Sequence, residues 1–237
     1  MSTEPTLLQA RNIARRHPDG HRWLLQDVSL EVPAAGRLSI AGPSGSGKTL
    51  LLRALAMLDR LEGGEVRWKG RPVGRDGIPQ FRKAVLYLHQ RPALWDETVE
   101  AALRAPFALA VHQRGQFDRG RIVRLLERLG RDESFLAKRS ADLSGGELQI
   151  AALLRAVQLD PIILLLDEPT AAVDPQTAAA VEELLGDWVG NSSDGRALVW
   201  VTHDAEQARR VADTTLHMRN GTIQGKKGTG PICRNGP

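Results

Sequence analysis

The sequence lacks most features that mark secreted or membrane-spanning proteins. Its 237 residues contain one cysteine, Cys233, which can form no disulfide within the chain and suits a reducing compartment. Its purely apolar runs, such as Phe107–Val111 and Ile162–Leu166, are far shorter than the roughly 20 residues that a membrane-spanning helix needs. The first residues show no basic segment followed by an apolar one, so no secretory signal is expected. We therefore expect a protein that does not cross a membrane by itself.

Charge of one sign is not concentrated anywhere. The chain has 32 Lys and Arg against 28 Asp and Glu, a formal net charge of +4. Apart from short pairs such as Arg15-Arg16 and Lys138-Arg139, the basic residues are scattered among acidic ones, as on the solvated faces of helices. Because a nucleic-acid-binding arm would cluster these residues, no direct contact with nucleic acid is expected. A hydrophobic content of 42% is enough for a full core in one large domain, or in one core with a small insert.

One glycine-rich stretch has the spacing of a phosphate-binding loop, namely Gly, four variable positions, Gly, Lys and Ser or Thr. It consists of Gly42, Pro43, Ser44, Gly45, Ser46, Gly47, Lys48 and Thr49. Glycines let backbone N–H groups approach phosphate oxygens, and a following helix directs its positive end at the same anion. Lys48 is expected to reach the β- and γ-phosphates of a nucleoside triphosphate, and the Thr49 hydroxyl to hold Mg²⁺. A chance Gly/Ser-rich turn is the alternative, but a predicted strand at 37–41 and a helix at 50–55 flank the loop.

The remaining patterns predict an α/β fold. Residues 7–14 and 23–32 mix apolar and polar positions around His-Pro-Asp-Gly, which predicts antiparallel strands. From about 91 to 142 only helical spacing appears, at 98–104, 119–129 and 134–138, which predicts a helical insert. Beyond it, strands at 162–166, 197–201 and 214–218 alternate with helices at 145–158, 175–189 and 205–212, and this alternation predicts a mostly parallel sheet. Further strands are expected at 66–68 and 84–89, a turn at 62–65 and a hairpin turn at 220–221.

Residues 1–225 are thus expected to form one domain, a phosphate-loop nucleoside triphosphatase core. It has a mostly parallel sheet, an N-terminal antiparallel β subdomain and an inserted helical subdomain. Residues 226–237 are rich in Gly and Pro, and we expect them to be a disordered tail.

Polar residues follow three of the predicted parallel strands, at the edge where open α/β sheets bind ligands. Asp167 and Glu168 follow the strand at 162–166; the first acid can hold Mg²⁺, and the second can orient and deprotonate an attacking water. His203 follows the strand at 197–201, near the expected γ-phosphate. Gln90 follows the strand at 84–89, and its amide can contact both Mg²⁺ and water. Structural alternatives remain open, namely an acidic pair that begins a helix before Pro169 and a histidine that serves only the fold.

The stretch Leu143-Ser144-Gly145-Gly146-Glu147 allows two explanations. Ser144 with Glu147 three residues later is a capping box, which is a purely structural signal. It does not explain two glycines in the first turn of a helix, each of which costs about 1 kcal/mol relative to alanine. Bare backbone at a helix N-terminus would let a phosphate approach. Since the phosphate loop already serves one nucleotide, this second set of donors suggests a site shared between two chains.

An ordered set of motifs runs along the chain, namely GPSGSGKT, Gln90, LSGGE, IILLLDEP, AAVD and His203. In this set of motifs the chain resembles the ATP-binding subunits of ABC transporters. The resemblance covers residues 7 to about 225. It implies an ATP hydrolase that uses ATP and Mg²⁺ and powers a separately encoded integral-membrane transporter subunit. It also implies a homodimer on ATP binding, and a cytoplasmic location, peripheral on the inner face of the cell membrane.

The same resemblance implies a role for each matching residue. Lys48 and Thr49 would bind phosphate and Mg²⁺, Asp167 would bind Mg²⁺, Glu168 would be the general base and His203 would contact the γ-phosphate. Gln90 would sense Mg²⁺ and the membrane partner. The remaining positions would belong to the dimer: Ser144, Gly145 and Gly146 would clasp the γ-phosphate of ATP held by a partner chain, and Asp174 would lie at the dimer junction.

The sequence departs from the family at several positions. His17 stands where an aromatic residue usually stacks on adenine, although Trp23 is nearby, and Glu147 stands where Gln is usual. Residues 90–99 and 198–203 are similar to a narrower group, the subunits of small two-component bacterial transporters linked to iron export and stress resistance. The membrane subunit is expected to dock between Gln90 and the helical insert, around Leu94 and Trp95.

A soluble ABC-type ATPase acting on nucleic acid or ribosomes is the alternative function. Such proteins usually carry a long coiled-coil insert or two ATPase cores, and this chain has neither. A phosphoryl-transfer kinase would have no use for LSGGE. The transported substrate and the direction of transport cannot be read from this chain.

Overall fold

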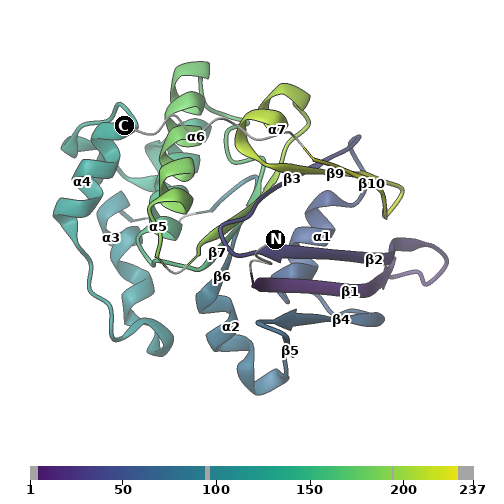
Figure 1. The fold of residues 1–237 in the computed structure, drawn as a ribbon. Coiled ribbons are helices and arrows are strands. Elements are labelled where there is room, and N and C mark those ends of the chain that lie inside the picture. The colour runs from purple at the N-terminus through teal and green to yellow at the C-terminus, as the bar shows by residue number, and fades with distance from the viewer. Residues whose placement is uncertain (1–4, 94–96, 194, 229–237) are drawn as a thin grey trace.

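Two β-sheets and the helices packed on them make up the computed structural model, which describes residues 5–93, 97–193 and 195–228 (Figure 1). The strands are β1 (Thr6–Arg16), β2 (Trp23–Pro33), β3 (Arg37–Ala41), β4 (Gly63–Trp68), β5 (Arg71–Pro72), β6 (Val85–Leu88), β7 (Ile163–Asp167), β8 (Ala197–Val201), β9 (Thr214–Arg219) and β10 (Thr222–Gly228). The α-helices are α1 (Lys48–Leu55), α2 (Ile78–Ala84), α3 (Val99–Arg104), α4 (Arg119–Arg128), α5 (Gly145–Val157), α6 (Pro175–Gly190) and α7 (Ala205–Val211). Short 3₁₀ helices are η1 (Arg75–Gly77), η2 (Ala105–Ala108), η3 (Ala110–His112), η4 (Glu133–Ala137) and η5 (Ser140–Asp142).

The larger sheet has six strands in the order β10-β9-β3-β8-β7-β6. The pairs β9–β3, β3–β8, β8–β7 and β7–β6 are parallel, and only β10 runs antiparallel to its neighbour. Every residue of β7 is buried. A strand covered on both faces needs apolar side chains on both, which explains its unbroken apolar run. The mostly parallel sheet is therefore confirmed.

The smaller sheet is antiparallel, in the order β2-β1-β4-β5. Together with α1 it covers one face of the larger sheet, where Leu8, Leu51 and Ile40 belong to one buried cluster with Ile163 and Leu165 of β7. We call this cluster the loop-side core, because it lies beneath the segment that joins β3 to α1.

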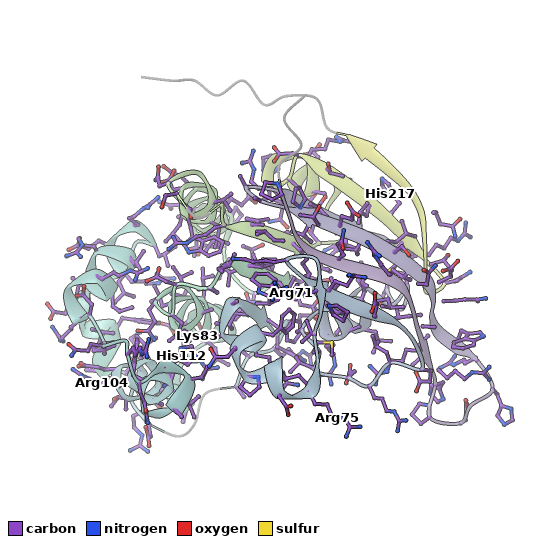
Figure 2. The ribbon with its side chains drawn as sticks, turned by 60° about the horizontal axis from the view of Figure 1, so that its bottom comes forward. Arg71, Arg75, Lys83, Arg104, His112 and His217 are labelled. Atoms are coloured by element: carbon purple, nitrogen blue, oxygen red, sulfur yellow. The ribbon has the colours of Figure 1, made fainter. Side chains whose placement is uncertain are left out.

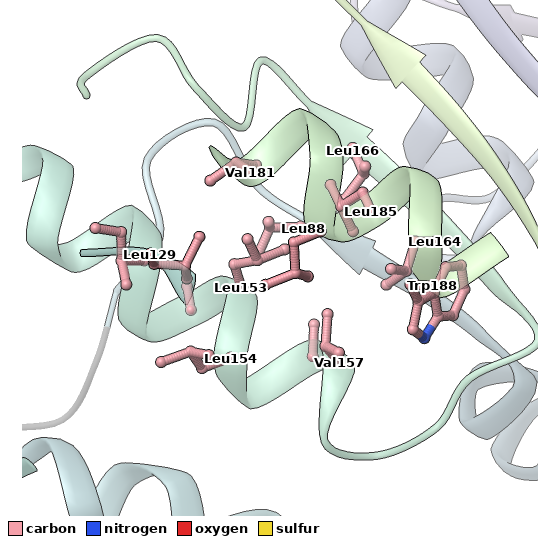
Figure 3. Close-up of a cluster of buried hydrophobic side chains, with 14 of the residues drawn as sticks. Leu88, Leu129, Leu153, Leu154, Val157, Leu164, Leu166, Val181, Leu185 and Trp188 are labelled. Carbon is pink, nitrogen blue, oxygen red and sulfur yellow. The ribbon is translucent and has the colours of Figure 1, made fainter. Parts of the chain in front are cut away.

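The opposite face carries α5, α6 and the helical insert. Leu164 and Leu166 of β7 point into this second cluster, with Leu153 of α5 and Leu185 of α6 (Figure 3). We call it the insert-side core. Successive side chains of β7 thus enter different cores, as the two-residue repeat of a strand requires.

The insert is fixed to the rest of the domain by polar contacts as well as by this core. Gln158, just after α5, donates from Nε2 to the Leu103 carbonyl at 2.7 Å. On another side η3 packs against α2, where Lys83 lies near the buried His112 (Figure 2). Burial, and then the charge of Lys83, lower the pKa of His112. The insert is therefore in contact with both the end of α5 and α2.

Some expectations about local structure are wrong. The predicted turn at 62–65 is instead the start of β4, whose Gly63 pairs with Ala14. Gly64 has φ 76°, and an added Cβ would lie 2.4 Å from the Arg11 carbonyl oxygen, so this turn-like glycine serves a strand irregularity. The sequence patterns also predict neither β5 nor α2.

The C-terminal hairpin runs further than expected. Asn220 and Gly221 have φ 49° and 75° and connect β9 to β10, as the predicted turn requires. The expected disorder from Lys226 is wrong for residues 226–228, because their backbone pairs with β9 through Gly228 opposite Thr214. Residues 229–237, with Cys233, lie outside the described residues, as do Leu94 and Trp95. In the part of the chain that is described, no helix combines the length and apolarity needed to span a membrane.

Candidate active site

The phosphate loop, residues 42–49, joins the end of β3 to α1. Gly42 and Gly47 are needed there because other backbone lies close behind them. A Cβ at Gly42 would lie 2.1 Å from the Met218 carbonyl oxygen, and one at Gly47 would lie 3.1 Å from the Leu24 carbonyl oxygen. Gly47 also adopts φ 103° as the N-cap residue just before α1. The loop is therefore backed by β2 and β9 and directs the N-terminus of α1 outward.

Lys48 lies inside the loop rather than on its surface. The residue is 7% exposed, and Nζ donates to the carbonyl oxygens of Gly42 at 2.8 Å and Pro43 at 3.0 Å. Beside it is a cavity of about 430 Å³, lined by Ser44, Gly45, Gly47, Lys48, Thr49, Leu50, Gln90, Glu168 and His203. The fold thus brings the loop together with predicted residues from three other segments.

Asp167 and Thr49 form the candidate magnesium site. Asp167 is 1% exposed, accepts a hydrogen bond from the Tyr87 hydroxyl at 3.0 Å and is hydrogen-bonded to the Thr49 side chain. Burial raises the pKa of Asp167, although these two hydrogen bonds oppose the rise. Burial, followed by the charge of Asp167, also raises the pKa of Tyr87. A hydroxyl and a carboxylate side by side fit Mg²⁺, which takes oxygen ligands and usually keeps several waters.

Glu168 has a strained backbone, and its carboxylate contacts both Gln90 and His203. Its φ is 48°, a conformation that costs a non-glycine residue of order 1 kcal/mol and persists only where the surroundings enforce it. Its N–H donates to the Val201 carbonyl at 3.1 Å. Gln90 Nε2 donates to Glu168 Oε2 at 2.9 Å, and His203 Nδ1 lies 3.5 Å from the same oxygen. The three predicted catalytic side chains, from the ends of β6, β7 and β8, therefore meet at one carboxylate.

A second cavity, of about 400 Å³, begins on the other side of Glu168 and His203. Glu182 on its wall accepts from Arg210 at 3.0 Å and from Gln207 at 2.9 Å. The Glu168 side chain is only 19% exposed, whereas His203 is 73% exposed. The carboxylate is thus sheltered between two cavities, with the imidazole at its open side.

The capping box predicted at the start of α5 is present. Ser144 Oγ accepts from Glu147 N at 3.3 Å, and Ser144 N donates to Glu147 Oε2 at 2.9 Å. Lys138 Nζ lies 2.6 Å from Glu147 Oε1, and its hydrogen bond is the main cause that lowers the pKa of Glu147 to about 2. Glu147, where the family usually has Gln, therefore gains an ion pair and keeps the cap.

The two glycines after Ser144 differ in their surroundings. A Cβ at Gly146 would lie 2.7 Å from the Ala172 carbonyl oxygen, whereas one at Gly145 would lie 3.6 Å from the Ala172 Cβ, an ordinary contact. Close packing within the chain thus accounts for Gly146, a reason that sequence analysis did not foresee. The described residues that line the cavity at the phosphate loop do not include Ser144, Gly145 or Gly146.

Asp174 caps α6 within its own chain. Its Oδ1 accepts from Thr177 N at 2.9 Å and its Oδ2 from the Thr177 hydroxyl at 2.7 Å. These bonds lower the pKa of Asp174. Its predicted place at a dimer junction stays a prediction.

Of the two predicted adenine platforms, His17 lies in the turn between β1 and β2, and Trp23 is the first residue of β2. His17 Nδ1 lies 2.9 Å from Asp19 Oδ2, and the Arg16 guanidinium lies 4.2 Å from the centre of the Trp23 ring. Neither His17 nor Trp23 is among the described residues that line the two cavities. The choice between these two rings therefore stays open.

Gln149, a buried residue of α5, is a further residue of the site that the sequence motifs do not indicate. Its Nε2 donates to the carbonyl oxygens of Gln90 and Glu168, both at 3.2 Å, and its Oε1 accepts from Ala172 N at 3.0 Å. The only signal in the sequence is an amide inside an otherwise apolar helix segment, since its partners are backbone atoms of distant segments.

Comparison with known proteins agrees with this geometry. The ABC transporter family model matches residues 25–171. A probable anion import ATP-binding protein of Haloferax volcanii is 35% identical over 92% of this chain and 78% of its own length. The methionine import ATP-binding protein MetN of Thermobifida fusca is 35% identical over 84% of this chain, and the sulfate/thiosulfate import ATP-binding protein CysA of Escherichia coli is 34% identical over 86%. The chain spans only 62% and 56% of the lengths of these last two relatives.

Solved structures show the same arrangement. The ATP-binding cassette MJ0796, in a dimeric post-hydrolysis state bound to ADP and Pi, superposes with a TM-score of 0.84. The match covers 95% of this chain and 100% of that chain, at 26% sequence identity. A further dimeric structure of MJ0796 gives a TM-score of 0.85. From the family match, the relatives and the shared fold, this chain belongs to the ABC transporter family.

Proposed function

We propose that this chain is the ATP-binding and ATP-hydrolysing subunit of an ABC transporter and powers a separately encoded integral-membrane subunit. One observation carries the proposal: a single cavity joins the phosphate loop to Gln90, Glu168 and His203. The relatives, which are named as ATP-binding proteins of import systems, support it over a soluble ATPase acting on nucleic acid or ribosomes. The narrower resemblance to iron-export subunits stays a prediction.

Each part of the cavity has a chemical task in this proposal. The loop N–H groups and Lys48 bind the phosphates of ATP, and Thr49 and Asp167 hold Mg²⁺. When bound, Mg²⁺ supplies positive charge that offsets the charge on the phosphate oxygens. Glu168 takes a proton from the attacking water, and Gln90, which already contacts its carboxylate, orients both.

The remaining side chains bind the nucleotide from its edges. His203, at the open side of Glu168, contacts the γ-phosphate. His17 or Trp23 stacks on adenine. Residues Ser144, Gly145 and Gly146 clasp ATP held by the second chain of a homodimer, with Asp174 at the junction. The dimeric form of MJ0796 supports this shared site.

The proposed location of the chain follows from its binding to an integral-membrane transporter subunit. The chain attaches at the cytoplasmic face of the cell membrane, where the transporter subunit docks between Gln90 and the helical insert. A displacement of Gln90 on docking would reach Glu168 and α5, since the Gln90 side chain contacts Glu168 and its backbone carbonyl contacts Gln149 of α5.

Two substitutions test the proposal by separating binding from chemistry. Lys48→Ala removes the cation of the loop and should abolish tight ATP binding in calorimetry. Glu168→Gln keeps the shape of the side chain but removes the base, so ATP should still bind while turnover falls by roughly 10²–10⁴. Matched controls are Lys69→Ala and Glu183→Gln, which lie outside the residues lining the phosphate-loop cavity.

The contradicting results are equally specific. Unchanged ATP affinity in Lys48→Ala would refute the assignment of the loop. Wild-type turnover in Glu168→Gln would show that another group is the base.

A further inference from the structure

Gln149 holds three functional segments together from one side chain. The residue is 4% exposed and projects from the second turn of α5. Its amide reaches the backbone of Gln90 after β6, of Glu168 after β7, and of Ala172 in the turn that leads to α6. These segments supply the proposed amide sensor, the proposed base and the turn that packs on Gly146.

The partners fix the orientation of this amide. An NH₂ group has two hydrogens to donate, and here it faces two carbonyl oxygens, while the amide oxygen faces one N–H. The reversed amide would place its oxygen against two carbonyl oxygens. Only the orientation with Nε2 facing the carbonyls and Oε1 facing the N–H satisfies all three backbone groups. A side chain that cannot make these bonds removes the partner of the Gln90 carbonyl and of the Ala172 N–H, and leaves the Glu168 carbonyl with the N–H of Ala171 alone.

We propose that Gln149 is a positioning residue that keeps Glu168 in its strained backbone conformation and in register with Gln90. This inference rests on the proposed function, because it assigns how the proposed base is placed. The peptide N–H of Glu168 donates to the Val201 carbonyl, and its own carbonyl accepts from both Ala171 N at 3.1 Å and Gln149 Nε2 at 3.2 Å, so β8, the following turn and α5 together hold φ at 48°. Through the same amide, the backbone of Gln90 moves with α5 and not independently of it.

Two near-isosteric variants separate the three bonds. Gln149→Met removes all of them, whereas Gln149→Glu removes both donors but keeps an oxygen for the N–H of Ala172. Gln158→Met is the matched control, since Gln158 is also buried and donates to a backbone carbonyl, but that of Leu103 in the insert. All variants are made in the full chain.

Steady-state kinetics give the first readout. Misplacing a reacting group by about 1 Å can cost roughly 10²-fold in rate, so kcat per folded molecule should fall about 10- to 100-fold in both Gln149 variants. KM for ATP should change little, because the phosphate loop is untouched. The control should keep its kcat even if its melting temperature falls.

Hydrogen–deuterium exchange of the nucleotide-free protein gives the second readout, which does not depend on hydrolysis. Peptides covering 168–173 should exchange faster in Gln149→Met. The Ala172 amide should stay protected in Gln149→Glu, and the control should match wild type in this segment.

The possible outcomes distinguish failure of the proposed function from failure of the role proposed for Gln149. Wild-type protein that does not hydrolyse ATP would overturn the proposed function and, with it, the catalytic consequence of Gln149. Normal protection of 168–173 in Gln149→Met, or an unchanged kcat in both variants, would overturn the inference itself. A drop in kcat that only follows the folded fraction would reduce Gln149 to a structural residue.

Discussion

At the scale of single residues, Asp167 shows how function opposes stability. Its carboxyl is almost fully buried next to Tyr87 and Thr49, in a place that disfavours negative charge. A residue chosen only for stability would be neutral here. The acid is retained at the edge of β7 where a metal ligand is expected, so its cost to the fold is a mark of function.

Asp167→Asn should therefore change how stability depends on pH. Because the folded-state pKa is raised, the folded protein holds this proton more tightly than the unfolded chain, and wild type loses stability as pH rises from the ordinary value of 3.8. The free energy of unfolding of the variant, minus that of wild type, should grow over this range and then level off. Urea unfolding from pH 4 to 8 measures it, and stabilisation by Mg²⁺ and ATP should be lost in the variant. A difference that is constant with pH would refute this account.

At the scale of elements, the start of α5 has two kinds of contact. Its cap is closed within the chain by Ser144 and Glu147, and its first turn packs on the turn at Ala172. The position of the whole helix relative to the turn before α6 therefore depends on the absence of one methyl group at Gly146.

Alanine substitutions at the two neighbouring glycines should differ in their effect on the free energy of unfolding. Gly146→Ala places Cβ against the Ala172 carbonyl and should lower the free energy of unfolding by about 1–3 kcal/mol. Gly145→Ala has room and should leave stability unchanged or raise it by up to about 1 kcal/mol. Chemical denaturation of both variants provides the comparison. Equal losses at the two positions would show that packing on Ala172 is not the reason for Gly146.

The same scale shows what can be predicted from sequence. The bounds of β3 and β8 match the prediction because β3 lies between Gly36 and Gly42, and the apolar run of β8 lies between two polar residues. In contrast, α2 buries only Phe81 and so presents no periodic apolar face. The role of Gln149 escapes sequence analysis for another reason, since its partners are backbone atoms that only the folded chain brings together.

At the scale of the whole molecule, the proposed site is divided between the phosphate loop and the start of α5. The cavity beside Lys48 is not lined by Ser144 among the described residues, whereas the proposed chemistry uses both. Two chains that face each other would complete two such sites.

Complementation tests this arrangement. Lys48→Ala and Ser144→Arg homodimers should each be inactive, but in a mixed dimer both lesions fall in one site and the other site is intact. Mixing the variants should restore ATP trapping at one site per dimer, and hydrolysis if that site can act alone. Trapped radiolabelled nucleotide is the measurement, with heterodimers verified by differently tagged chains. No recovery in verified heterodimers would exclude a shared site.

The alternation of side chains along β7 has a consequence for how such a protein diversifies. Ile163 and Leu165 support the loop-side core, while Leu164 and Leu166 support the insert-side core. The sheet thus acts as a partition, and a substitution in one compartment need not be compensated in the other. The insert-side core can therefore accept new side chains while those packed beneath the phosphate loop stay the same, provided that Gln149 and the start of α5 are kept.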